Sequence, residues 1–212
     1  MFYKTIKYFL NRSIVYNLYL KIPIQMNFNG VQSFGLLPIL RKPLHKLQTI
    51  DDEYFSKNKN TIPAQMHSFD WLSDFKNSGG INLLQKSRKL ILNWHDCKFK
   101  LNSDAWEEVL IAKRIINLSI NFEFYGLSAN EEFKKIIINI IFFHFKHLII
   151  INNLKVEKYD SDIEVSKSIL LLCNHFKNKN YFNKIVKFIK KQVSHQINKD
   201  GFHKSINVNE QA

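Results

Sequence analysis

The spacing of apolar side chains changes character at residue 67. From Phe69 onward, apolar residues recur at intervals of three and four, which predicts a series of amphipathic helices. Before that point the pattern is irregular after one helix at the start of the chain. We therefore expect two parts: an N-terminal arm with one helix over residues 1–66, and a helical domain over residues 67–212.

The helical domain is expected to contain about six helices in consecutive antiparallel pairs joined by short turns. Glycines and polar capping side chains separate the apolar stripes. The expected helices run from Phe69 to Phe75, from Ile81 to about Trp94, from Ala105 to about Tyr125, from Glu131 to about Ile151, from the Asp160–Asp162 cap to Phe176, and from Tyr181 to Ile197. The fold class is therefore all-α, with antiparallel helical hairpins that form a bundle, a solenoid or part of a toroid.

The N-terminal arm is basic and aromatic. One helix is expected from Phe2 to about Lys21, ended by Pro23, and residues 24–63 are expected to wrap over the helical body. The first helix either packs on its own domain or lies on a membrane surface. It lacks a clean signal-peptide pattern, and the apolar run from Ile136 to Ile151 is too short and too interrupted to be a transmembrane segment.

The charge of the chain narrows the classes of partner. A formal net charge of +13 favours polyanions, which include nucleic acid, acidic membrane and acidic polysaccharide. The alternative is that lysines only cover solvated faces. No nucleic-acid-binding signature is present, so no specific nucleic acid is expected. Cys97 and Cys173 lie far apart without metal-ligand spacing, so neither a metal nor a cofactor is expected.

Several side chains are candidates for binding. Arg114 lies among apolar residues of a helix and needs a carboxylate, supplied by the protein or by a ligand. Trp71, Trp94 and Trp106 can stack on sugar rings, although their helical spacing favours the core. His203 follows an Asp-Gly helix end, so it lies on a loop where it either contacts a sugar acid or has no role.

Four short segments, in order, resemble one family. They are HSFDWL at His67–Leu72, the stretch ending in Trp94 at Leu90–Trp94, AW followed by AKRIIN within Ala105–Asn117, and HQINKDGFHKSIN at His195–Asn207. Together they resemble the helical domain of the heparinase II/III-like proteins, a polysaccharide-lyase superfamily. The resemblance covers about two-thirds of the chain and implies that the helices form a partial α/α toroid.

The resemblance also implies a function. Members of the family cleave uronate-containing polysaccharide by β-elimination, in which a base removes a proton, a second group neutralises the charge, and an acid protonates the leaving oxygen. It implies an acidic polysaccharide as partner and a periplasmic location. The residues of the matching segments that we expect to bind substrate are Trp71, Arg114, Asn117 and His203.

The end of the chain departs from the family pattern. Ser205, Asn207 and Glu210 stand where the lyase form has Glu, Ser and the catalytic Tyr, and the sequence ends at Ala212 without a β-sandwich domain. No catalytic residue is therefore assigned, and lyase activity is expected only if a missing C-terminal domain completes the site. The alternative is a non-catalytic binding or scaffold module for an envelope glycan or a partner protein, cytoplasmic if the lack of a signal peptide is real.

Overall fold

The structure is a computed structural model that describes residues 2–22, 50–59, 61–101, 103–154 and 162–175, together with residues 182, 183, 185–187, 189, 190 and 194. All regular elements in this part of the chain are helices, which confirms the all-α class. None of the described helices is long and apolar enough to cross a membrane. The hairpin pairing and the toroidal arrangement stay predictions, as does the boundary at residue 67.

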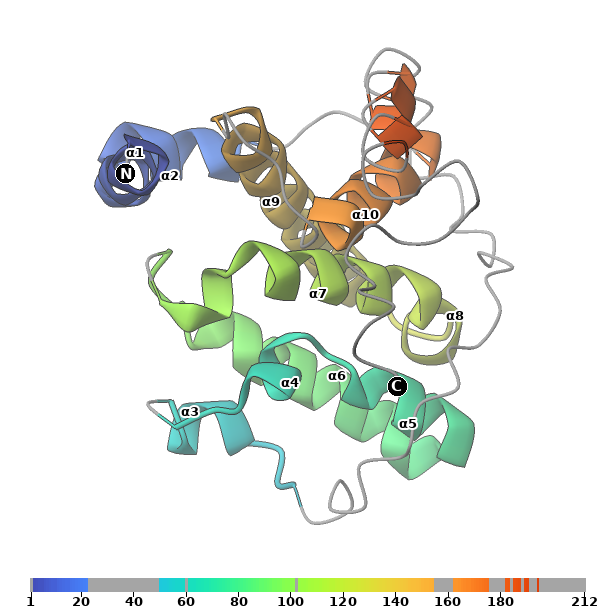
Figure 1. Cartoon of the computed structure of the whole chain (residues 1–212). Coiled ribbons are helices and arrows are strands. Elements are labelled where there is room, and N and C mark those ends of the chain that lie inside the picture. Colours follow the sequence, from blue (N-terminus) through green and yellow to red (C-terminus); the bar gives the residue numbers. More distant parts are fainter. Residues whose placement is uncertain are drawn as a thin grey trace, which may run out of the picture.

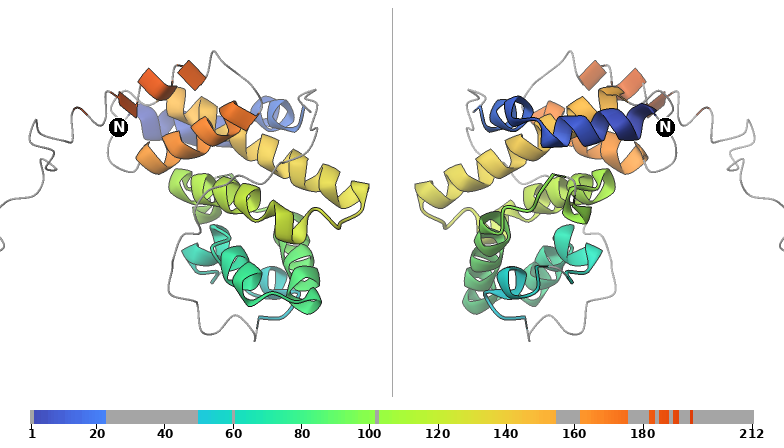
Figure 2. Two further views of the ribbon diagram at one scale, coloured as in Figure 1. Left: turned by 90° about the vertical axis from the view of Figure 1, so that its right-hand side faces the viewer. Right: turned by 90° about the vertical axis from the view of Figure 1, so that its left-hand side faces the viewer.

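Helix α7 lies across the middle of the molecule, with α4, α5 and α6 on one side and α9 and α10 on the other (Figure 1). Helices α1 and α2 lie at one edge, beside α9 (Figures 1 and 2). The elements are α1 (Phe2–Arg12), α2 (Ile14–Lys21), α3 (Tyr54–Lys57), α4 (Ala64–His67), α5 (Trp71–Ser78), α6 (Ile81–Asp96), the 3₁₀ helix η2 (Asp104–Trp106), α7 (Glu108–Ile120), α8 (Phe122–Tyr125), α9 (Glu131–Leu154) and α10 (Asp162–His175).

The central position of α7 explains its composition. Ile111, Ile115 and Leu118 on this helix are fully buried, because other helices pack on it from both sides. Helix α9 is also buried on most sides between Ile140 and Leu148, where every residue except the half-buried Phe143 is buried. A helix that is apolar on most sides is stable only between neighbours, and α9 fits that rule.

Two of the expected helices are interrupted, so both expectations are wrong in their bounds. The helix expected from Phe2 to Lys21 ends at Arg12 and restarts at Ile14. Ser13 between them is extended, with ψ 124°, and its hydroxyl accepts a hydrogen bond from the Tyr16 backbone N–H at 3.3 Å. Serine competes in this way with the continuing helix and caps a new one.

The helix expected from Ala105 to Tyr125 is divided into three elements. Trp106 belongs to η2, and extended Glu107, with ψ 138°, separates it from α7. The Trp106 indole N–H donates to the Phe99 carbonyl at 2.9 Å and so fixes η2 on the loop after α6. At the other end, α7 stops at Ile120 and the short α8 follows.

Other expectations agree with the structure or lie outside it. Helices α5, α6, α9 and α10 occur close to where they were expected. Short helices α3 and α4 fall in a stretch that was expected to be irregular. Of the helix expected from Tyr181 to Ile197 only single residues are described, and His203 lies outside the described residues.

Polar contacts, rather than apolar packing alone, attach α1 and α2 to the body. Helix α1 makes the first two of the following contacts, and α2 with the residue directly after it makes the others. They join Lys7 Nζ to Glu108 Oε1 (3.0 Å), Asn11 Nδ2 to the Leu101 carbonyl (2.8 Å), the Tyr16 hydroxyl to His147 Nδ1 (2.8 Å), and Lys146 Nζ to the carbonyls of Tyr19 (3.3 Å) and Ile22. Each contact spans about a hundred residues of sequence or more, so together they fix the orientation of both helices.

We predict that Tyr16→Phe lowers the free energy of unfolding by about 1–2 kcal/mol, because it leaves buried His147 Nδ1 without its partner. Chemical denaturation measures the change. Tyr19→Phe is the matched control, since Tyr19 on the same helix is 48% exposed. It is expected to change stability by less than about 0.5 kcal/mol, and equal effects of the two variants would contradict the attachment described here.

Candidate functional site

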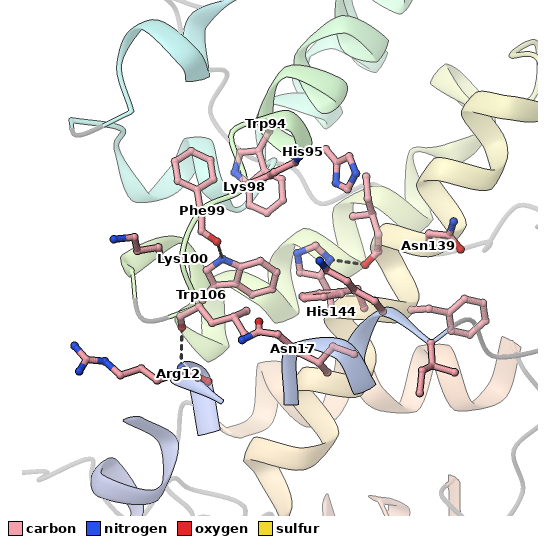
Figure 3. Close-up of a pocket in the computed structure, with 18 residues that line it drawn as sticks. Arg12, Asn17, Trp94, His95, Lys98, Phe99, Lys100, Trp106, Asn139 and His144 are labelled. Carbon is pink, nitrogen blue, oxygen red and sulfur yellow. Dashed lines mark hydrogen bonds between the residues drawn. The ribbon is translucent and has the colours of Figure 1, made fainter. Parts of the chain in front are cut away.

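A pocket of about 810 Å³ lies between α1–α2, the end of α6 with the loop that follows it, and α9 (Figure 3). Its lining contains an aromatic group, a cationic group and a set of amide and imidazole side chains. The aromatic group is Trp94, Phe99, Trp106, Phe142 and Phe143; the cationic group is Arg12, Lys21, Lys98 and Lys100; the polar set is Asn11, Asn17, His95, Asn139 and His144. Among the described residues that line the pocket, none is acidic.

The aromatic wall is held in place from behind. Trp106 lies 6.1 Å from Trp94 and 5.4 Å from Phe143 between ring centroids, and it stacks on His144 at 4.9 Å. The Trp94 indole N–H donates to His67 Nδ1 at 3.1 Å. Both tryptophans are therefore rigid, and the half-buried Phe99 and Phe143 extend the wall toward solvent.

The cationic side chains form the rim of this wall. Arg12, Lys21, Lys98 and Lys100 are all exposed. Lys98 has φ 46°, a left-handed conformation that is uncommon for a residue with a side chain, and it turns the chain directly after α6. This turn brings Lys98, Phe99 and Lys100 to the pocket together.

A buried cation lies directly behind the wall. Arg114 has no exposed surface, and its guanidinium donates to the His67 carbonyl at 2.8 Å, to the Ala105 carbonyl at 2.7 Å and to His144 Nε2 at 3.1 Å. Its Cζ lies 4.1 Å from the centre of the Trp94 ring. Burial lowers the pKa of Arg114 to about 9, which leaves it charged at neutral pH. Within the described part of the chain, no carboxylate pairs with it.

The candidate residues Trp71, Arg114 and Asn117 converge on the segment that precedes α5. Asn117 Nδ2 donates to the Ser68 carbonyl at 2.9 Å and to Asp70 Oδ1 at 2.8 Å. Trp71 is fully buried and donates to the Met66 carbonyl at 3.3 Å. These three side chains contact the protein interior and do not line the pocket. Substrate binding by them, and by His203 outside the described residues, stays a prediction.

These contacts stabilise an unusual backbone conformation. Phe69, which directly follows the two carbonyls that Arg114 and Asn117 bind, has φ 62° although it is not a glycine. Its ring is fully buried against Trp71 and Trp94, at 5.3 and 5.4 Å. The strained backbone persists because hydrogen bonds and packing on both sides determine it.

Two of the buried imidazoles are neutral at physiological pH. His144 Nδ1 donates to the Ile140 carbonyl at 2.5 Å, so Nε2 is free to accept from Arg114. Burial first, and then the Arg114 charge, hold the pKa of His144 well below its usual range. Burial lowers the pKa of His147 to about 3. Neither imidazole can therefore exchange protons with a ligand near neutral pH, and the exposed imidazole of the lining belongs to His95.

The sequence analysis named two residues of the pocket, Trp94 and Trp106, as candidates for stacking on sugar rings while favouring the core for both, and it missed the cationic rim. The available signal was the run Lys98-Phe99-Lys100, in which an aromatic residue lies between two cations. The contribution of Arg12 and Lys21 had no local signal, because it depends on how α1 and α2 dock on the body.

No protein-family model, curated protein or solved structure matches this chain. The resemblance to heparinase II/III-like proteins therefore stays a prediction that rests on the four short segments.

We predict that Arg114→Met lowers the free energy of unfolding by about 3–5 kcal/mol, since it leaves two buried carbonyls and His144 Nε2 without a donor. Chemical denaturation measures the loss. Lys167→Met, an exposed position on α10, is the control and is expected to change stability by less than about 0.5 kcal/mol. A loss below 1 kcal/mol for Arg114→Met would show that the cluster does not depend on the guanidinium.

We also predict that stability falls as pH drops from 7 to 5. His144 and His147 have an unfolded pKa of about 6.5 and a much lower pKa when folded, so below pH 6.5 only the unfolded chain takes up their protons. Their contribution to the free energy of unfolding is fully present above that pH. Below it, the free energy of unfolding declines by about 3 kcal/mol per pH unit, because both imidazoles take up protons in the unfolded state.

Urea denaturation at a series of pH values measures this dependence. Burial and the Arg114 charge also lower the pKa of His67, to about 4, which adds to the decline in the same direction. His147→Leu removes one of the titrating groups and is expected to reduce the slope, whatever its effect on absolute stability. A flat profile between pH 7 and pH 5 would show that these imidazoles are not buried in neutral form.

Proposed function

We propose that the chain is a helical domain that binds acidic, uronate-containing polysaccharide in the pocket between α1–α2, α6 and α9. The observation that supports this most directly is the pairing of a cationic rim with an aromatic wall, with no acidic side chain among the described lining residues. Carboxylates of the polymer are attracted to the rim, and the apolar faces of its sugar rings pack on the wall.

Two further features support a sugar ligand. The volume of about 810 Å³ lies in the range of small-molecule pockets and suits a short segment of a polymer. The exposed amide of Asn139 also lines the pocket. A sugar hydroxyl can donate to an amide oxygen, whereas a phosphate diester has no proton to offer.

The arrangement of helices around α7 is, in this proposal, a partial α/α toroid of the heparinase II/III-like type. The role proposed for the described residues is binding. Burial holds the pKa values of His144 and His147 far below neutrality, so both are weak bases, and both are enclosed; neither is proposed as the base, and β-elimination would require groups from a further, C-terminal domain. A non-catalytic glycan-binding module is the alternative that the same pocket supports.

The test compares binding of the full chain to heparin, alginate and double-stranded DNA over a range of salt concentrations. We expect Lys98→Glu/Lys100→Glu to weaken binding to alginate by about tenfold or more, since two rim charges are reversed. Lys76→Glu/Lys167→Glu changes the net charge equally at exposed positions that do not line the pocket, and it is expected to retain most of the affinity.

Phe99→Ala tests the aromatic part without changing charge. It is expected to weaken binding to alginate and heparin, with the fold checked by circular dichroism. One outcome would contradict the proposal. If DNA and both polysaccharides bind equally and with the same salt dependence, and both charge-reversal variants lose the same affinity, the interaction is general electrostatic attraction.

A further inference from the structure

The outward side of α1 and α2 carries most of the exposed apolar surface of the described residues. The described residues include nine exposed large hydrophobic residues, and seven of them belong to α1, to α2 or to the residue directly after α2. They are Tyr8, Phe9, Ile14, Val15, Leu18, Tyr19 and Ile22, which we call the outer face. The right-hand view of Figure 2 shows both helices at the surface of the molecule.

The polar contacts of α1 and α2 determine which side is turned outward. Lys7, Asn11 and Tyr16 all bond to the body, so the inward side of these helices is polar at those positions. Ile14 and Leu18 lie one turn apart on the opposite side of α2 from Tyr16, at 77% and 59% exposure. The inward side of α2 has an apolar part too, since Tyr16 and Leu20 are buried in the core. Unlike an ordinary surface helix, α2 also has a second apolar side that faces solvent.

The charged residues in the sequence around the outer face are all basic. The first 50 residues contain no Asp or Glu, and Lys4, Lys7, Arg12 and Lys21 fall within α1 and α2. Lys7 pairs with Glu108, whereas Arg12 and Lys21 are exposed at the borders of the outer face. Arg12 lies over the Tyr8 ring at 4.1 Å from its centroid, so cation and aromatic residue are presented together.

We propose that the outer face docks on an anionic lipid surface, with α1 and α2 lying in the plane of the headgroups. Apolar side chains such as Phe9 and Leu18 enter the acyl boundary, and Arg12 and Lys21 contact the lipid phosphates. Tyr8 and Tyr19 are amphipathic side chains of the kind enriched at this depth. The charge argues against a second copy of the chain as occupant, because two copies at +13 repel each other.

This inference can be tested separately from the proposed glycan binding, although Arg12, Lys21 and Ile22 take part in both surfaces. Phe9, Ile14, Val15 and Leu18 form the apolar centre of the outer face, and none of them lines the pocket. Loss of one interaction can therefore be measured while the other persists.

The test is flotation of the full chain with vesicles of phosphatidylcholine alone or mixed with phosphatidylglycerol. We expect binding to the mixed vesicles and little to the neutral ones. Ile14→Asp/Leu18→Asp is expected to reduce the bound fraction about tenfold or more, because two charges enter the apolar centre of the outer face.

Ile81→Asp/Leu127→Asp is a matched control. It changes the same residue types at 63% exposure at the start of α6 and 55% exposure in the turn between α8 and α9, and it alters the net charge equally, so it is expected to bind like the unaltered chain. Circular dichroism confirms that both variants fold. Equal loss in the two variants, equal binding to neutral and mixed vesicles, or no binding to either would overturn the proposal. The proposal would also be overturned if the chain associates with itself in the absence of lipid and Ile14→Asp/Leu18→Asp abolishes that association, because the outer face would then join two copies.

Discussion

The structure depends on one buried guanidinium. Arg114 joins the carbonyl of His67 before α5, the carbonyl of Ala105 in η2 and the imidazole of His144 on α9, and it packs against Trp94 of α6. A planar group with several donors in fixed directions can hold these separate elements at once, which a lysine cannot do. The desolvation of the charge is offset by these acceptors and by the aromatic rings around it, and the cost of losing them is correspondingly high.

The same cluster shapes the pocket. Trp94, Trp106 and His144 contact Arg114 on one side and line the pocket on the other, so the wall on which a ligand would pack is rigid before any ligand arrives. A preformed wall lowers the ordering cost of binding. The buried positive charge adds to that of the exposed rim, and the enclosed, neutral histidines leave proton transfer near neutral pH to other groups.

The sequence was sufficient to predict the all-α class and the approximate positions of α5, α6, α9 and α10, because these helices follow clear apolar periodicity. It could not locate the breaks at Ser13 and Glu107, which local capping and the Trp106–Phe99 hydrogen bond determine. The sequence indicated that Arg114 needs partners, but these partners include backbone carbonyls and no carboxylate among the described residues. A pattern of residue types does not indicate which backbone carbonyls a side chain will bind. The cationic rim was missed because Arg12 and Lys98 line the same pocket only once α1 has docked on the body of the molecule.

The most direct test of the account is a nuclear magnetic resonance titration of the full chain with uronate oligosaccharides, observed at the tryptophan indole N–H signals. Trp94 and Trp106 line the pocket, whereas Trp71 is fully buried away from it and serves as an internal reference. The account predicts that the signals of Trp94 and Trp106 shift with saturation while that of Trp71 stays in place. Unchanged signals, or equal shifts of all three, would contradict a glycan site in this pocket.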